Sequence, residues 1–327
     1  MDLSIVTTLY RSETFVEAFY HRICVAASAI TSDFEVIFVN DGSPDGSLDV
    51  AVNLFQRDPR VRVIDLSRNF GHHRAIMTGL AHARGARVFL IDSDLEEDPA
   101  LLADFWERLE ATGADVIYGT QVSRKGGLWE RISGNLFYWV FKRLSSAPVP
   151  KNLVTVRLMS RRYVEALVLH RDREIFLAGL WQITGFRQIG LPITKLCKGS
   201  STYNFRNRVA VFVNAVTSFS VKPLVYIFYL GLSVFLASSA AALYLIFEKL
   251  FFGTFLFGWP SLIISIWMIG GITIFCIGII GIYLSKVFME TKDRPYSVIR
   301  EIYDRSEEQG KEQHAHQFRT ARGPLLY

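Results

Sequence analysis

Two long stretches without a charged residue constrain this chain more than any other feature. They cover residues 224–247 and 261–285. Each exceeds the roughly 20 residues that an α-helix needs to cross a bilayer. Apolar runs of this length seldom occur in soluble folds, although two buried helices of a globular core are the alternative. The sequence therefore predicts a transmembrane hairpin over residues 223–286, with these two stretches as its spans.

Basic residues flank the predicted hairpin on its two outer sides. Between the spans, Glu248 and Lys249 balance one another. The flanking cations are Arg206, Arg208, Lys222, Lys286, Lys292, Arg294 and Arg300. Because positive residues stay on the cytoplasmic side of a membrane, we expect both long segments and both termini in the cytoplasm. The protein is thus predicted to be a multi-pass protein of the cell (inner) membrane, and its opening residues show no secretory signal pattern.

The overall charge narrows the possible partners. The formal net charge is +5, with basic residues spread along the chain rather than stacked in runs. That balance suits a lipid bilayer and phosphorylated substrates, and it does not suggest nucleic-acid binding. The cysteines, at positions 24, 197 and 276, have neither metal nor disulfide spacing, which fits a reduced cytosolic setting.

The first part of the chain alternates short apolar runs with segments of helical length. The expected strands are 3–6, 34–39, 61–64, 88–91 and 116–118, with further strands at 154–159 and 186–189. Such alternation predicts an α/β fold, a parallel sheet with helices on both faces. In these folds ligands bind outside the carboxyl ends of the strands. We place this cytoplasmic domain at residues 1–203.

Two carboxylates follow the fourth expected strand at the edge where a ligand would bind. Asp92-Ser93-Asp94 comes directly after an apolar run. Paired acids at the end of a buried strand are costly unless a cation meets them, and oxygen ligands suit Mg²⁺ or Mn²⁺. A loop of merely solvated acids is the alternative. The motif makes Asp92 and Asp94 candidate metal ligands.

Two other loops belong to the same edge. Asp41, in the turn Asn40-Asp41-Gly42-Ser43-Pro44-Asp45-Gly46, follows the second strand. The third strand is followed by Leu66-Ser67-Arg68-Asn69-Phe70-Gly71-His72-His73-Arg74. Each alone could be an ordinary turn or a solvated basic loop. Acids and cations gathered at one edge favour a phosphorylated, metal-bound ligand.

The ordered set of these motifs resembles the family 2 glycosyltransferases. Within that family the chain is similar to the polyprenyl-phosphate branch, which includes dolichyl-phosphate mannosyltransferases and bactoprenol glucosyltransferases. The resemblance begins at Tyr10 and continues through Val156-Arg157-Leu158-Met159, Gly185-Phe186-Arg187-Gln188 and Ser218–Leu224 into the paired spans, about residues 3 to 300. It implies a GT-A type nucleotide-binding domain, an inverting glycosyltransferase, and a homo-oligomer such as a tetramer.

The resemblance also assigns roles to individual residues. It implies that the nucleotide-sugar donor is bound by Thr8, Tyr10, Asp41, Arg68, Asp92 and Ser93. Asp92 and Asp94 would hold the divalent cation and, with Arg157, form the catalytic group, Asp94 being the more direct metal ligand. The phosphate of the polyprenyl (undecaprenyl) phosphate acceptor would meet Arg131, Lys195 and Lys198.

The chain departs from the family pattern at Thr8, Asn40, Gln121 and Thr155. Thr155 stands where an acid often precedes Phe-Arg-Leu, and a missing base would matter for a hydroxyl acceptor. A phosphate monoester, with its second pKa near ~6, is already an anion at neutral pH. The resemblance therefore implies direct attack of a lipid phosphate on the sugar, for a cell-surface glycan such as O-antigen. Glu96 and Asp172 are the candidate bases if the acceptor is a hydroxyl.

Three other functions compete with this one. A polysaccharide synthase would use a glycan or lipid hydroxyl, but the chain lacks the usual Gln-x-x-Arg-Trp and further spans. A haloacid-dehalogenase-type phosphatase carries Asp-x-Asp on its first strand, not its fourth. A non-catalytic membrane scaffold would explain the four departures, yet both acids of the motif remain.

Two segments complete the predicted organisation. Residues 204–222 show apolar residues at helical spacing ahead of the first span and predict an interfacial amphipathic helix, with a core helix as the alternative. Residues 287–327 are expected to form a cytoplasmic tail with a disordered end.

Overall fold

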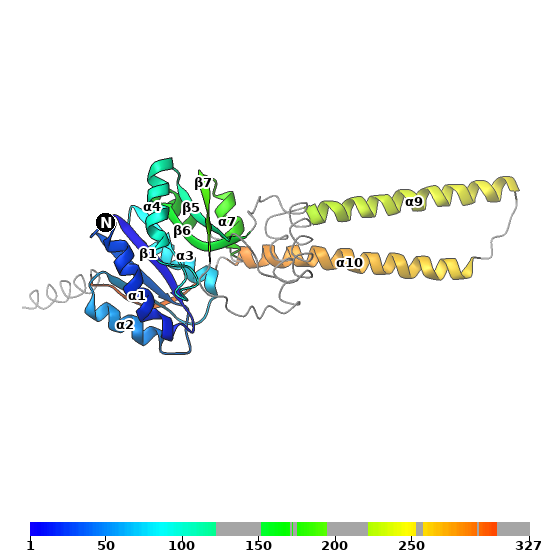
Figure 1. Ribbon diagram of the computed structural model, residues 1–327. Coiled ribbons are helices and arrows are strands. Elements are labelled where there is room, and N and C mark those ends of the chain that lie inside the picture. Colours follow the sequence, from blue (N-terminus) through cyan, green and yellow to red (C-terminus); the bar gives the residue numbers. More distant parts are fainter. Residues whose placement is uncertain are drawn as a thin grey trace, which may run out of the picture. The chain divides into compact units, whose positions relative to one another are not determined.

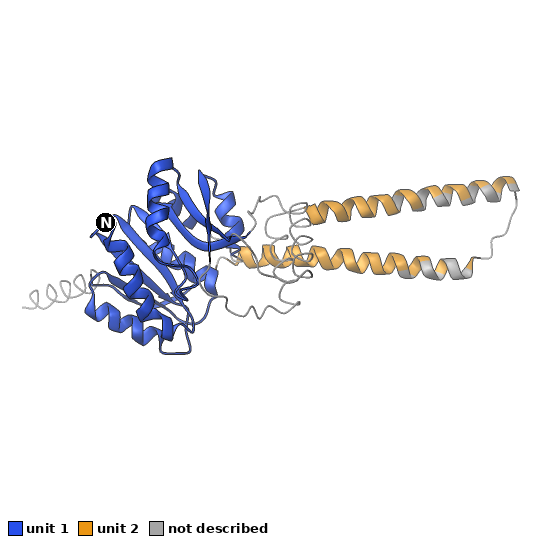
Figure 2. Cartoon of the chain, in the orientation of Figure 1, with its two compact units in different colours: residues 1–126, 149–202, 295–327 blue, residues 127–148, 203–294 orange. Residues whose placement is uncertain are grey.

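The computed structural model describes residues 1–121, 152–170, 172, 175–194, 222–252, 258–292 and 294–305. The chain divides into two compact units (Figure 2): residues 1–126, 149–202 and 295–327 form the first, and residues 127–148 and 203–294 the second. The first unit is an α/β domain, as the alternation of apolar runs predicted. The second contains two long helices.

The α/β unit is built on a mixed sheet (Figure 1). Its strands are β1 Leu3–Leu9, β2 Phe34–Asn40, β3 Val61–Leu66, β4 Arg87–Leu90, β5 Val116–Gln121, β6 Leu153–Ser160, β7 Gln188–Ile193 and β8 Ile299–Tyr303. Within the described residues their spatial order is β7-β5-β6-β4-β1-β2-β3-β8. The helices are α1 Glu13–Ser28, α2 Ser47–Arg57, α3 His72–His82, α4 Leu101–Thr112, α6 Arg161–Val168 and α7 Leu177–Ile183.

The strand directions correct the expectation of a wholly parallel sheet. Strands β1 to β4 pair in parallel, but β6 inserts antiparallel between β4 and β5, and β8 pairs antiparallel with β3. Strand β5 still runs in the same direction as β1 to β4, because two antiparallel pairings separate them. The carboxyl ends of β1 to β4 therefore meet at one edge, as the sequence predicted.

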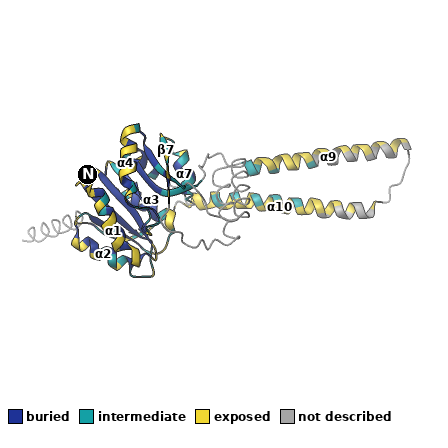
Figure 3. Cartoon of the chain, viewed as in Figure 1, coloured by how far each residue is buried: buried dark blue, intermediate teal, exposed yellow. Residues whose placement is uncertain are grey.

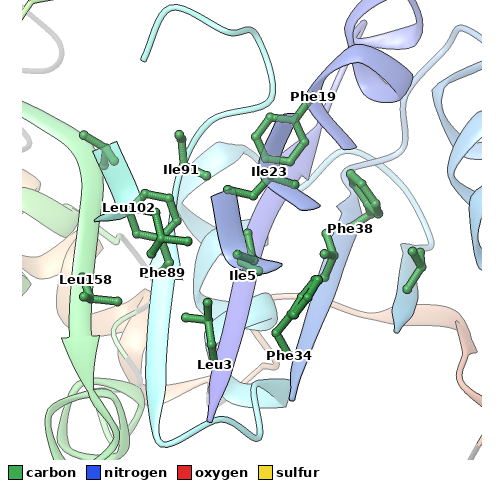
Figure 4. Close-up of a cluster of buried hydrophobic side chains, with 14 of the residues drawn as sticks. Leu3, Ile5, Phe19, Ile23, Phe34, Phe38, Phe89, Ile91, Leu102 and Leu158 are labelled. Atoms are coloured by element: carbon green, nitrogen blue, oxygen red, sulfur yellow. The ribbon is translucent and has the colours of Figure 1, made fainter. Parts of the chain in front are cut away.

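The central strands of the sheet are buried on both faces. One face packs against α1, α2 and α4 through a core in which Phe19 meets Phe38 edge to ring (Figure 4). Phe89 and Phe105 make the same kind of contact. The other face is covered by α3 and α6. Gly79 allows α3 to approach closely, because a Cβ there would lie 2.5 Å from the Val6 side chain. Strands buried on both faces read as continuous apolar runs, which is how the sequence shows them (Figure 3).

Strand β8 is the element that the sequence did not reveal. It lies in the segment expected to be a cytoplasmic tail, yet it pairs with β3 and completes the described sheet on that side. Asp304 at its end is 3% exposed and forms ion pairs with Arg62 and Arg84. Arg62 also pairs with buried Glu35 at 2.8 Å. The segment after the last helix thus belongs to the α/β unit.

The second unit contains α9 Lys222–Phe252 and α10 Trp259–Thr291, which contact one another. Among the described residues, Met268–Thr291 is long and apolar enough to cross a membrane, and none of its qualifying window is buried. Within α9, a shorter apolar stretch covers Lys222–Val234. Large apolar side chains are exposed on both helices, among them Phe228, Leu243 and Ile274. The predicted interfacial helix lies outside the described residues except for Lys222.

Candidate functional site

The candidate site is formed by the loops that leave the carboxyl ends of β1 to β4. Asp41 follows β2, the Ser67–Gly71 loop joins β3 to α3, and Asp92 and Asp94 follow β4. Parallel pairing between these strands brings the three loops to one edge. The structure thus brings together the motifs that the sequence predicted to share a ligand.

Asp41 holds the loop between β3 and α3. Its two carboxylate oxygens accept hydrogen bonds from the backbone N–H groups of Phe70 at 2.7 Å and Gly71 at 3.0 Å. Burial raises the pKa of Asp41, and these two hydrogen bonds oppose the rise. Next to it, Gly42 adopts φ +57° and lies so close to Arg68 that a Cβ would be 2.4 Å from its carbonyl carbon. Asp41 therefore shapes the site, and its contact with a nucleotide stays a prediction.

His72 is the site residue that sequence reasoning missed. Its Nδ1 lies 3.1 Å from the Thr8 hydroxyl, and its Nε2 lies 3.5 Å from Oδ1 of Asp92. It therefore joins the end of β1 to the acidic loop after β4. Burial lowers the pKa of His72, while the charges of Asp41 and Asp94 oppose that change. The signal was present in the sequence, because His72 opens the helix after the basic loop, but a histidine there looks like an ordinary loop cation.

In the Asp92-Ser93-Asp94 loop, a buried serine lies between a partly exposed and an exposed acid. Ser93 is 3% exposed, and its hydroxyl donates to the Thr8 carbonyl at 3.0 Å. Asp94 is exposed and accepts a hydrogen bond from the Glu96 N–H at 3.0 Å. Leu95 has φ +59°, which turns the loop sharply. Ser93 thus fixes the loop against β1, with partly exposed Asp92 before it and exposed Asp94 after it.

These two acids fit a cation shared with a substrate. Within the described ranges, no three His, Cys, Asp or Glu side chains gather as a metal cage. Mg²⁺ is commonly held by one or two carboxylates, with substrate phosphates and water completing its shell. The oxygen donors of Asp92 and Asp94 meet that requirement, so the residues present fit a divalent cation that binds together with a diphosphate.

Arg157 lies behind this loop on β6, where it pairs with Leu90 of β4. It is 1% exposed, donates to the carbonyls of Val154 and Thr155, and stacks on the ring of Trp181. Burial lowers the pKa of Arg157 to about 9, against the opposing charge of Asp92. A buried cation of this kind can stabilise a negatively charged site without reaching its surface. Its direct contact with a substrate stays a prediction.

Tyr10 and Arg68 border the site at its surface. Tyr10 is 46% exposed, with the Arg11 guanidinium 5.6 Å from its ring centre. Arg68 stacks over Phe70 at 4.1 Å and donates to the carbonyl of Asn69. An exposed tyrosine ring can stack on a nucleobase, and a guanidinium can bind phosphate. Both predicted donor contacts are therefore accessible.

Several predicted acceptor residues cannot be placed. Arg131, Lys195 and Lys198 lie outside the described residues. The two candidate bases are described: Glu96 lies half-buried in the loop after Asp94, and Asp172 lies in the segment after α6. The contacts of Arg131, Lys195 and Lys198 with an acceptor phosphate therefore stay predictions.

Comparison with known proteins identifies the family. The family model described as glycosyl transferase family 2 matches residues 4–166. A Mycobacterium tuberculosis protein whose name assigns it to the glycosyltransferases is 58% identical over 303 residues, covering 93% of this chain and 89% of that protein. The chain is a family 2 glycosyltransferase. The family match and this relative confirm the predicted family and the predicted enzyme class of this glycosyltransferase.

Another relative extends the similarity through the helices. A Shigella flexneri protein named SfII prophage-derived bactoprenol glucosyl transferase is 30% identical over 306 residues, covering 93% of this chain and 99% of that protein. This name confirms the predicted kinship with the polyprenyl-phosphate branch. Among solved structures, a Pyrobaculum calidifontis mannosyltransferase in complex with GDP-Man and Mn²⁺ has a TM-score of 0.47 and 17% identity, covering 65% of this chain and 62% of that chain.

Proposed function

We propose that this glycosyltransferase moves a sugar from a nucleotide-sugar donor to a polyprenyl phosphate, such as undecaprenyl phosphate, with inversion at the anomeric carbon. The observation that carries the proposal is the pair of acids, partly exposed Asp92 and exposed Asp94, held beside the Asp41 loop at one edge of the sheet. The bactoprenol name of a relative covering 93% of the chain supports the acceptor.

The donor would lie across the three loops of this edge. Tyr10 would stack on the base, and Arg68 would meet phosphate. When bound, a divalent cation at Asp92 and Asp94 would supply positive charge to the departing nucleotide diphosphate. His72 would hold Asp92 in place through its contact with Thr8. The chain's own residues thus bind, orient and electrostatically stabilise the leaving group.

The acceptor phosphate would attack the anomeric carbon directly. A phosphate monoester is an anion at neutral pH, so the step forms one O–C bond and breaks another without a base or a covalent glycosyl-enzyme. Arg131, Lys195 and Lys198 are the residues proposed to hold that phosphate. Thr155, in place of an acid, agrees with an acceptor that needs no deprotonation.

The reaction would take place at the cytoplasmic face of the cell membrane. The apolar segment Met268–Thr291 and the exposed apolar side chains of α9 and α10 support membrane insertion. We propose that the two helices form a transmembrane hairpin, preceded by an interfacial helix at 204–222. The basic flanks of the hairpin support cytoplasmic termini, and the family resemblance supports a homo-oligomer.

The decisive experiment uses membranes containing the full chain. They are incubated with labelled UDP- or GDP-sugars, undecaprenyl phosphate and Mg²⁺ or Mn²⁺, and the label is followed into organic solvent. We expect one sugar nucleotide to give a solvent-extractable product that releases its sugar in mild acid. Label in a glycan or in an acid-stable lipid instead would overturn the phosphate acceptor and indicate a hydroxyl. No transfer and no nucleotide-sugar binding would favour a scaffold.

A further inference from the structure

The segment that follows α10 contacts the loop that shapes the donor side of the site. Ser67 donates its backbone N–H to the carbonyl of Val298 at 2.9 Å, and Arg300 donates from Nη2 to the carbonyl of Ser67 at 2.8 Å. Ser67 is the first residue of the loop whose later N–H groups hold Asp41. The chain returning from the helices therefore fixes that loop at its origin.

A second connection runs from the exposed side chain of Arg300 through two buried side chains to the turn after β2. Arg300 Nη1 lies 3.2 Å from Oδ2 of Asp65, whose Oδ1 accepts a hydrogen bond from the Asn40 amide at 2.7 Å. The side-chain amide oxygen of Asn40, Oδ1, in turn accepts a hydrogen bond from the backbone N–H of Ser43 at 3.2 Å. Asn40 and Asp65 are 2% and 1% exposed. This relay joins β8 to the turn that contains Asp41.

The chemistry of the relay depends on the order of its groups. A buried carboxylate is stable only where donors and a cation compensate it, and Asp65 receives both. Because the amide nitrogen of Asn40 donates to Asp65, its oxygen must face Ser43. An aspartate at position 40 would instead place two carboxylates at hydrogen-bonding distance. The amide at position 40 is therefore matched to the acid at 65, and that acid to Arg300.

We infer that Arg300 and Asp65 are positioning residues for the nucleotide-sugar site, acting through Asn40 on the turn at Asp41. They touch neither donor nor acceptor, so they set donor affinity by fixing the turn. Strand β8, which follows α10, thus supports the donor site without contacting the donor. This inference rests on the proposed function, in which the edge of the sheet binds the nucleotide sugar.

The first test compares Arg300→Met, Arg300→Lys and wild type as full chains in detergent with undecaprenyl phosphate. We expect Arg300→Met to raise the donor KM about tenfold, the scale of one hydrogen bond to a charged group. Acceptor KM and kcat should stay within about twofold, and lysine should restore most of the donor KM by returning the charge. Arg305→Met is the matched control, because Arg305 binds the carbonyls of Phe55 and Gln56 instead.

The second test examines the hydrogen-bonded pair Asn40 and Asp65. Asn40→Asp should raise the donor KM, and adding Asp65→Asn should lower it again, because the swap restores one donor facing one acceptor. An unchanged donor KM in folded Arg300→Met would overturn the inference. So would equal changes in donor KM and acceptor KM together with a lower melting temperature, which a general loss of structure would give.

Binding of UDP and GDP with Mn²⁺, measured by titration calorimetry, separates this inference from the proposed function. If wild type binds one nucleotide but transfers no sugar to polyprenyl phosphate, the acceptor proposal fails while Arg300→Met still weakens nucleotide binding. If wild type transfers sugar and Arg300→Met binds the nucleotide equally well, the positioning role fails alone. If wild type binds neither nucleotide, both fail.

Discussion

Two groups of charged side chains, at opposite edges of the same sheet, differ in burial and in how their charges are compensated. At the amino edge, Glu35, Arg62 and Asp304 are nearly fully buried and paired with one another. At the carboxyl edge, Asp94 is exposed and Asp92 is 23% exposed, with its Oδ1 3.5 Å from Nε2 of His72. Charges compensated within the protein hold the fold together, whereas acids left at a surface edge are suited to a cation that arrives with a ligand.

Removing the outer acid should have the largest effect. Asp94→Asn keeps the size of the side chain but removes the charge that would hold the cation, so we expect transfer to fall about 1000-fold, or ~4 kcal/mol. Labelled sugar transfer measures the loss. Asp104→Asn, an exposed acid on α4, is the control and should keep wild-type activity. Full activity in Asp94→Asn would contradict a cation-binding role for the acids at the carboxyl edge.

Removing a buried acid at the amino edge should lower stability and leave donor binding unchanged. Asp304→Ala removes one partner of buried Arg62 and should destabilise the unit by about 3 kcal/mol, or roughly 6–12 °C in Tm. The donor KM at permissive temperature should stay near the wild-type value, because Asp304 lies away from the ligand edge. Thermal melts and kinetics on one preparation check both. A large change in KM with an unaltered Tm would reverse the assigned roles of the edges.

The pH dependence of stability should show a smaller effect, at the buried carboxyl of Asp58. Asp58, before β3, is a buried carboxyl whose pKa burial alone would raise, but hydrogen bonds from Arg60 and Tyr20 lower it to about 2. Because the folded pKa lies below the unfolded value of 3.8, its stabilisation is present above pH 4 and is lost as the pH falls towards 2. We expect ~2 kcal/mol. Urea unfolding of wild type and Asp58→Asn should converge as the pH falls through this range.

The smallest effect concerns the residue that links two loops of the ligand edge. His72→Ala removes the contacts to Thr8 and Asp92 and should lower kcat/KM about tenfold, or ~1.4 kcal/mol. His72→Gln should recover part of it, because an amide can still bond to both neighbours. His82→Ala, on the same helix but beside Arg62, is the comparison variant. Equal losses in both histidine variants would point to damage to α3 instead of the site.

Much of the α/β unit could be predicted from local patterns. Apolar runs located β1 to β4, and their alternation with helices placed Asp41, Asp92 and Asp94 at one edge. The insertion of β6 between β4 and β5 could not be predicted, because side-chain patterns identify strands without specifying their partners. Strand β8 is short and carries Arg300 and Glu301, so its sequence resembles a polar tail.

The candidate site was predictable in its acids and less so in its supporting residues. Asp-x-Asp is recognisable because two acids only two positions apart, directly after an apolar run, are costly unless a cation meets them. Burial of Arg157 and Ser93 depends on tertiary packing that spacing does not reveal. His72 was missed for a related reason, since its importance lies in contacts with Thr8 and Asp92 from two other loops.

Strand β8 also has a consequence for how the protein is made. During synthesis, β3 can pair with β2 but lacks its outer partner, β8, until residues 299–303 have left the ribosome. These residues follow both long helices. Until then β3 presents an unpaired sheet edge, which favours association with other chains. A soluble fragment that ends before α9 would keep that open edge permanently and leave Arg62 without Asp304. Synthesis of the helices must therefore precede completion of the enzyme's own sheet.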